Sequence, residues 1–260
     1  MARHVLPLRL VHFSAERIIA NMPASAPWEL GAFRMLAESR SADGPVGGDF
    51  YAFQLRGPKR LTVVIGDACG RGGEGASLLP SVLPQLEELS RFKARPSRLL
   101  ERLNRRLAQS MPDDRFVTSA AFDLDAQAGT LTVANAGHVP AMLRSPRGYV
   151  AVIGRASGPP LGILPDSSYI EECYPIAKGD VVVFMTDGVL EAVETDLMKM
   201  PTLTTLVAQA PAGSRGVHRS LLARLDGYGA QQRADDMTLL SLEILGDADS
   251  PSFEHLEQAI

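Results

Sequence analysis

Cysteine, tryptophan and long hydrophobic runs are scarce in this chain of 260 residues. The two cysteines, Cys69 and Cys173, allow at most one bridge, which excludes a disulfide-based scaffold and favours a reducing cytoplasmic location. No stretch approaches the roughly 18 uncharged apolar residues that a membrane span needs. Charged residues also interrupt residues 1–20, where a secretory leader would have its apolar core. We therefore expect neither a membrane anchor nor a leader.

An excess of basic residues is also missing. The chain carries 26 Lys and Arg against 30 Asp and Glu, a formal net charge of −4, which argues against a dedicated nucleic-acid-binding protein. There is no internal repeat, low-complexity tract or interdomain linker. The sequence therefore predicts one domain over residues 29–246, preceded by a short lead-in (1–28) with a helix and followed by a tail (247–260).

Short apolar or alternating runs separated by turn residues predict β-strands along most of the chain. Successive strands joined by short turns form antiparallel sheets, so the predicted fold class is α+β with segregated helices. Strands are expected at 30–37, 49–55, 61–65, 116–124, 130–135, 141–144, 149–153, 170–175, 181–185 and 237–245. Helices are expected at 14–21, capped by Ser14, at 75–89, at 97–110, capped by Ser97, and within 203–225.

Aspartates stand at the ends of several predicted strands, three of them within one residue of a glycine. Asp49 opens one strand, Asp67 lies where a strand enters a glycine-rich turn, and Asp187 follows another strand. Asp235 and Asp236 come directly before the last strand. Aspartate beside glycine is also common turn chemistry, so no single position is informative. Gathered at one sheet edge, however, four carboxylates without His or Cys would suit two Mg²⁺ or Mn²⁺ ions, which can activate water and hold a phosphoryl group.

The ordered motifs resemble those of the metal-dependent type 2C (PPM-type) serine/threonine protein phosphatases, in particular the bacterial branch named for the stage II sporulation protein E. The resemblance runs from about residue 28 to 245. The motifs are Gly47–Tyr51, Gly66–Gly72, Asn135–Pro140, Pro160–Gly162, Gly179–Glu191 and Asp235–Thr238.

The resemblance implies a sandwich of two antiparallel β-sheets flanked by helices, with a dinuclear Mn²⁺ or Mg²⁺ site at one end. It implies that metal-activated water attacks a phosphoserine or phosphothreonine, and that the substrate is an anti-sigma-factor antagonist. The metal ligands that it implies are Asp49, Asp67, the carbonyl of Ala68, Asp187 and Asp235. The resemblance also implies positions that orient the metal ligands or contact the phosphate, namely Asp236, Arg71, His138 and Gly188.

Two departures from the family pattern leave other functions open. Ala52 stands where many members have Asp, and Arg71 where many have His. A degenerate phosphatase that binds a phosphoprotein without turnover is one alternative, and a phosphoesterase acting on nucleotides or other small molecules is another.

Three further features have a structural and a functional interpretation. His138 either donates a proton or anchors its loop, and we favour the anchor. Cys69 is either redox-sensitive or a small packed residue. The basic segment 91–106 is either a solvated helix face or a docking surface for an acidic partner. We expect no nucleic-acid or membrane partner, and regulation through a partner protein or a homodimer, with the 14–21 helix as one contact.

Overall fold

A computed structural model of the chain describes residues 18–20, 27–42, 46–70, 73–90, 93–112, 114–193, 199–227 and 235–246. Its strands form two six-stranded antiparallel sheets. Sheet A has the order β1 (Ile18–Ala20), β4 (Asp49–Leu55), β5 (Arg60–Ala68), β6 (Val117–Asp125), β7 (Thr130–Ala136), β10 (Glu172–Pro175). Sheet B has the order β2 (Trp28–Leu30), β3 (Phe33–Arg40), β12 (Met237–Ile244), β11 (Val181–Met185), β8 (Ala141–Arg144), β9 (Val150–Ile153).

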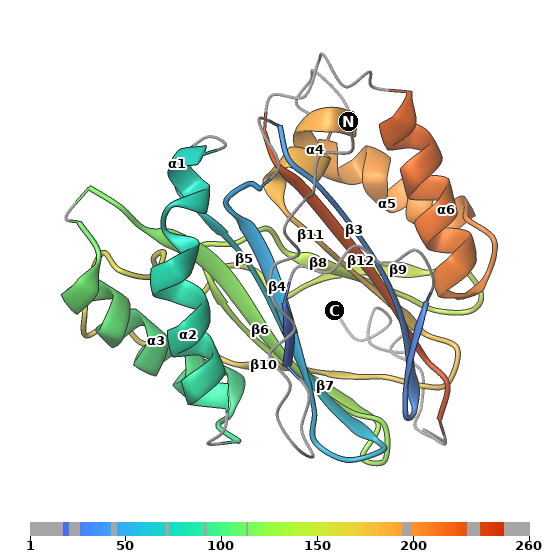
Figure 1. Cartoon of the computed structure of the whole chain (residues 1–260). Coiled ribbons are helices and arrows are strands. Elements are labelled where there is room, and N and C mark those ends of the chain that lie inside the picture. The colour runs from blue at the N-terminus through green and yellow to red at the C-terminus, as the bar shows by residue number, and fades with distance from the viewer. Residues whose placement is uncertain are drawn as a thin grey trace, which may run out of the picture.

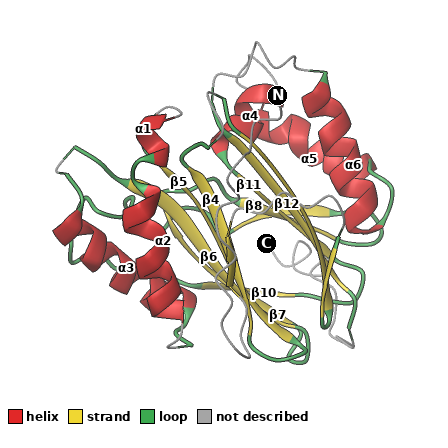
Figure 2. Ribbon diagram, in the orientation of Figure 1, coloured by secondary structure: helices red, strands yellow, loops and turns green. Residues whose placement is uncertain are grey.

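Helices cover the outer face of each sheet, which gives four layers (Figures 1 and 2). On sheet A lie α1 (Gly73–Ala76), α2 (Leu79–Ser90) and α3 (Pro96–Ser110). On sheet B lie α4 (Asp187–Val193), α5 (Lys199–Gln209) and α6 (Gly213–Asp226). Within the described ranges, no helix has the length and apolar character needed to cross a membrane. The predicted α+β sandwich is confirmed.

The central strands are buried on both faces, which explains their nearly continuous apolar runs. In β4, Tyr51 and Phe53 belong to the core between the sheets, whereas Phe50 and Ala52 belong to the core beneath α2 and α3. Successive side chains point to opposite faces of a strand, so each central strand contributes to two cores. These apolar layers fix the position of the strand ends, where the aspartates lie.

The predicted helix over residues 14–21 is wrong where the structure describes it. Ile18–Ala20 form β1, which pairs with β4 so that Ile18 lies opposite Gln54. Two turns of helix are marginal in water, whereas an edge strand gains backbone hydrogen bonds from the sheet beside it. Residues 14–17 and 21 lie outside the described residues. The predicted domain boundary at residue 28 falls inside β2.

Other predicted elements are divided or bounded differently. The strand expected at 30–37 is split into β2 and β3 by a turn at Gly31, where φ is +61° and a Cβ would lie 2.1 Å from the Pro58 carbonyl oxygen. The helix expected at 75–89 is divided into α1 and α2, the helical segments expected within 203–225 are α5 and α6, and α4 was not predicted. Ser97 does not cap α3 with its own side chain. Instead, Glu171 accepts hydrogen bonds from the Ser97 amide (3.0 Å) and hydroxyl (2.7 Å).

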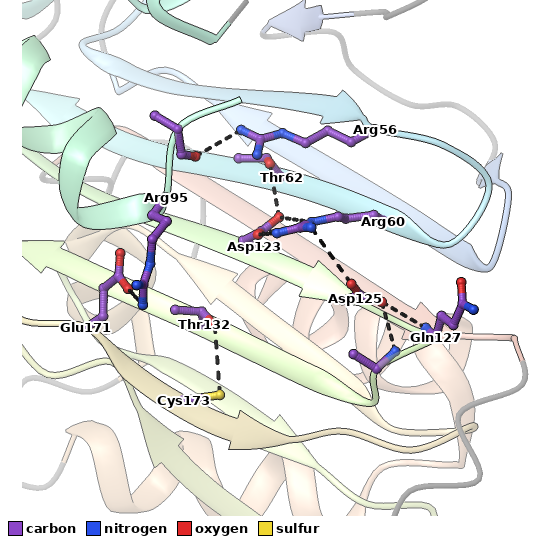
Figure 3. A network of polar contacts seen from close by, with 12 residues as sticks. Arg56, Arg60, Thr62, Arg95, Asp123, Asp125, Gln127, Thr132, Glu171 and Cys173 are labelled. Atoms are coloured by element: carbon purple, nitrogen blue, oxygen red, sulfur yellow. Dashed lines mark hydrogen bonds and ion pairs between the residues drawn. The ribbon is translucent and has the colours of Figure 1, made fainter. Parts of the chain in front are cut away.

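The strand hairpins place different chemistry at the two ends of sheet A. At one end, Arg60 of β5 forms an ion pair with the nearly buried Asp123 of β6, and Thr62 bonds to the same carboxylate (Figure 3). At the other end, β4 begins and β5 ends, with Asp49 directly opposite Asp67. At one end, therefore, a carboxylate is paired with an arginine, and at the other end two carboxylates face each other.

Candidate active site

All four predicted aspartates lie at the same end of the sandwich. Asp49 is the first residue of β4, and Asp67 stands opposite it near the end of β5. Asp187 is the first residue of α4, two residues after the last residue of β11, and Asp235 precedes β12, the neighbour of β11. Figure 1 shows α1 and α4, which follow β5 and β11, at this end of the two sheets. The antiparallel order thus brings together carboxylates from four distant segments.

The carboxylates are close enough to oppose one another's ionisation. Burial raises the pKa of Asp67 to about 9, and the charges of Asp49, Asp187, Asp235 and Asp236 raise it in the same direction. Burial also raises the pKa of Asp49 to about 8, although hydrogen bonds from Thr186 and Thr238 act the other way. The pKa of Asp187 is raised by burial and by Asp235. The pKa of Asp67 is thus affected by the charges of all the other aspartates of the site.

The chemistry of these side chains fits a hard divalent cation. The donors are carboxylate oxygens, the ligands that Mg²⁺ and Mn²⁺ prefer, and a cation would offset the repulsion that, after burial, raises the pKa values of Asp49, Asp67 and Asp187. In the part of the chain that the structure describes, no three His, Cys, Asp or Glu side chains already form a chelating group. The structure therefore brings the predicted carboxylates together without showing coordination geometry.

Thr186, which the sequence reasoning did not single out, holds Asp49 in place. Its hydroxyl donates to Asp49 Oδ2 at 2.7 Å and accepts the Thr238 amide at 2.9 Å. Both threonines are fully buried. The hydroxyl therefore links the backbone of β12 in sheet B to a carboxylate of sheet A. The available sequence signal was a Thr placed between an apolar, β-branched run and Asp-Gly.

Glycines let the backbone segments of the site approach closely. A Cβ on Gly48 would lie 2.6 Å from the carbonyl oxygen of Ala68, and one on Gly75 would lie 2.7 Å from the same atom. The Gly48 carbonyl accepts the Ala68 amide at 3.1 Å. A Cβ on Gly188 would lie 2.0 Å from the Asp236 carbonyl oxygen. The lack of a side chain at Gly188 thus lets two backbone segments pack together. The Ala68 carbonyl lies between the segments that contain Gly48 and Gly75.

His138 anchors its loop. Its amide donates to Asn135 Oδ1 at 2.7 Å, and Asn135 Nδ2 donates to the carbonyls of His138 (2.9 Å) and Gly154 (2.7 Å). His138 Nδ1 lies 2.9 Å from the hydroxyl of Thr118, the residue paired with Asp67 on β6. Burial lowers the pKa of His138 to about 4, so the ring is neutral at pH 7. These contacts favour the anchoring interpretation over a proton donor.

Two other predicted positions have different outcomes. Arg71 lies outside the described residues. Cys69 is a free, half-buried thiol that packs against the core beneath α2 and α3, and its sulfur accepts the Phe116 amide at 3.1 Å. Cys69 is thus a packed residue beside the site.

Comparison with known proteins gives consistent matches. The sequence profile described as Stage II sporulation protein E (SpoIIE) matches residues 57–245. The chain is 27% identical over 228 residues to the phosphoserine phosphatase RsbU of Bacillus subtilis (strain 168), covering 85% of this chain and 65% of that protein. The chain thus spans less than two thirds of that relative.

Solved structures share the fold. The RsbU and RsbW domains of a Mycobacterium tuberculosis protein match with a TM-score of 0.74 and 24% identity, over 85% of this chain and 63% of that one. The PP2C phosphatase domain of B. subtilis SpoIIE, with a fragment of its regulatory domain, matches with a TM-score of 0.72 and 16% identity, over 89% and 71%. Two other matches were solved with metals: RsbX with magnesium (TM-score 0.65) and the PstP catalytic domain with two manganese ions (TM-score 0.58).

Proposed function

The chain belongs to the stage II sporulation protein E (SpoIIE) family, and from this premise we propose that it is a metal-dependent phosphoprotein phosphatase. Its reaction is hydrolysis of phosphoserine or phosphothreonine. The observation that carries the proposal is the convergence of Asp49, Asp67, Asp187 and Asp235 at one end of the sandwich, where burial and neighbouring carboxylates raise the pKa values of Asp49, Asp67 and Asp187. The similarity to a named phosphoserine phosphatase, RsbU, supports the same reaction.

We assign the metal-holding role to the four aspartates and the carbonyl oxygen of Ala68. Bound Mg²⁺ or Mn²⁺, the metals of the RsbX and PstP structures, would polarise the phosphoryl group and supply activated water. Asp67, whose carboxylate experiences the charges of Asp49, Asp187, Asp235 and Asp236, would hold a cation jointly with these neighbours. Thr186 orients Asp49, and the neutral His138 holds the loop that follows β7.

The substrate in this proposal is a small phosphorylated regulatory protein of the anti-sigma-factor antagonist type, located in the cytoplasm. The likeness to RsbU supports this choice, although the chain spans 65% of that protein. The non-catalytic alternative gains no support from Ala52, because this residue packs in the apolar core beneath α2 and α3. Its methyl group belongs to a buried layer of the fold and does not leave a gap in the carboxylate cluster.

Hydrolysis of p-nitrophenyl phosphate and a phosphoserine peptide, with and without Mn²⁺, tests the proposal. The wild type should require the metal, and Asp67→Asn and Asp187→Asn should each lower kcat/KM by at least about 100-fold. Asp123→Asn is the matched control, because it removes a buried carboxylate at the opposite end of sheet A. Folded, Mn²⁺-bound wild type that hydrolyses neither compound would support a binding module. Preference for nucleotides would support a small-molecule phosphoesterase.

A further inference from the structure

Asp236 is a buried carboxylate beside the site whose two oxygens both receive hydrogen bonds from the segment before β4. Oδ2 accepts the Gly48 amide at 2.7 Å. Oδ1 accepts the Ala42 amide at 2.8 Å and the Ser41 hydroxyl at 3.1 Å. Only 3% of Asp236 is exposed. Its oxygens are thus directed at the backbone that leads into Asp49.

The surrounding chain is shaped to admit this side chain. A Cβ on Gly47 would lie 2.1 Å from the Asp236 carboxyl carbon, and one on Gly188 would lie 2.0 Å from the Asp236 carbonyl oxygen. Such separations are far below van der Waals contact, so both positions require glycine. Asp236 is therefore enclosed by a glycine of the segment that leads into Asp49 and by the glycine following Asp187.

The contacts continue from Asp236 to the backbone on either side of the site. Gly48 donates its amide to Asp236, and its carbonyl accepts the amide of Ala68, the residue after Asp67. On the other side, the Asp236 amide donates to Asp235 Oδ1 at 2.9 Å. One residue thus connects three of the segments that supply the site: the start of β4, the end of β5 and the start of β12.

We propose that Asp236 is a positioning residue that sets the geometry of the metal-binding segments and is not itself a metal ligand. This inference rests on the proposed function, because it assigns a role toward the cation of the same site. A carboxylate has about four acceptor positions, and hydrogen bonds from three donors leave little of this capacity for a metal ion. Outer partners that orient metal ligands typically change metal affinity about 10- to 100-fold when they are removed.

The test is Asp236→Asn, with Mn²⁺ binding measured by calorimetry and p-nitrophenyl phosphate hydrolysis measured across Mn²⁺ concentrations. The amide nitrogen of Asn is a donor and would face another donor. The substitution therefore removes hydrogen bonds from the segment before β4 while it keeps the shape of the side chain. We expect the Mn²⁺ Kd to rise about 10- to 100-fold with the number of bound ions unchanged. Hydrolysis should recover at high Mn²⁺. Asp187→Asn is the comparison for a lost ligand, and there excess metal should not restore activity.

Two results with Asp236→Asn would overturn the positioning role. Loss of a bound ion in Asp236→Asn, as in the ligand variant, would make Asp236 a ligand. An unchanged Mn²⁺ Kd with only a lowered Tm, as expected for the control Asp123→Asn, would make its role purely structural.

If Asp236→Asn does not fold, Ser41→Ala removes one donor to the same carboxylate and should weaken Mn²⁺ binding about two- to tenfold. An unaltered Kd there would refute the proposal. A wild type that binds no Mn²⁺ would instead remove the proposed function.

Discussion

Replacing Asp67 with asparagine should change how the stability of the metal-free protein depends on pH. The folded-state pKa of Asp67 is raised to about 9, from an ordinary value of 3.8, by burial and by four neighbouring carboxylates. Between these pH values the folded state binds more protons than the unfolded state. The free energy of unfolding therefore falls as pH rises, and the Asp67 contribution to stability is greatest in acid. The asparagine side chain carries no ionisable proton, so the variant lacks this contribution.

The magnitude follows from linkage. One proton corresponds to about 1.4 kcal/mol per pH unit, so Asp67 alone accounts for at most about 4 kcal/mol between pH 5 and pH 8. Because the titration of Asp67 is coupled to that of Asp49 and Asp187 and the site can relax, we expect Asp67→Asn to gain about 1–3 kcal/mol on the wild type over this range. The variant should thus become the more stable protein at pH 8 in EDTA, although it has lost its proposed catalytic function.

Urea unfolding in EDTA at pH 5, 6, 7 and 8 and constant ionic strength measures this effect. Trp28, the only tryptophan, is a suitable fluorescence reporter because its ring lies 5.3 Å from that of Phe53 across the two sheets. Parallel stability curves for wild type and Asp67→Asn would refute the electrostatic reasoning. A gap that widens equally for Asp123→Asn would show that the trend does not come from the site. Saturating Mn²⁺ should stabilise the wild type at pH 8 more than the variant.

Two further predictions concern stability. Arg144→Met should lower the free energy of unfolding by about 3–5 kcal/mol in urea, because the buried guanidinium donates to the carbonyls of Val207 (2.8 Å) and Ala210 (2.7 Å) at the end of α5. Glu171→Gln should cost about 1 kcal/mol at pH 7 and almost nothing at pH 3 in thermal unfolding. Burial alone would raise the pKa of Glu171, but the hydrogen bonds from Ser97 and the charge of Arg95 lower it overall, so its contribution is lost in acid.

The strand pattern was the most predictable part of the fold. Runs such as 61–65 and 181–185 are apolar and β-branched, and turns such as Asp125–Gly129 carry residues that favour reversal. In the structure the Asp125 carboxylate accepts the amides of Gln127 and Ala128, as this turn chemistry requires. Local preferences were sufficient because each hairpin joins neighbours in the chain.

Elements that depend on distant partners were less predictable. Ile18–Ala20 have a helix-compatible sequence, and only the edge of β4 makes them a strand. Ser97 resembles a helix cap, yet a carboxylate 74 residues away accepts its amide and hydroxyl. The helix α4 begins at Asp187 in a motif that reads as a turn, and its packing against sheet B makes it helical. In each case, a long-range contact outweighs a weak local preference.

The sequence by itself determined the α+β class, the antiparallel pairing of strands joined by short turns and the aspartates at strand ends, because these follow from residue periodicity and turn chemistry. The tertiary structure decided what those aspartates do to one another. Pairing of β4 with β5 sets Asp49 against Asp67, and β11 beside β12 adds Asp187 and Asp235. The same packing enclosed Asp236 among backbone amides. Burial and the distance between charges govern carboxylate chemistry, and both exist only once the two sheets have packed together.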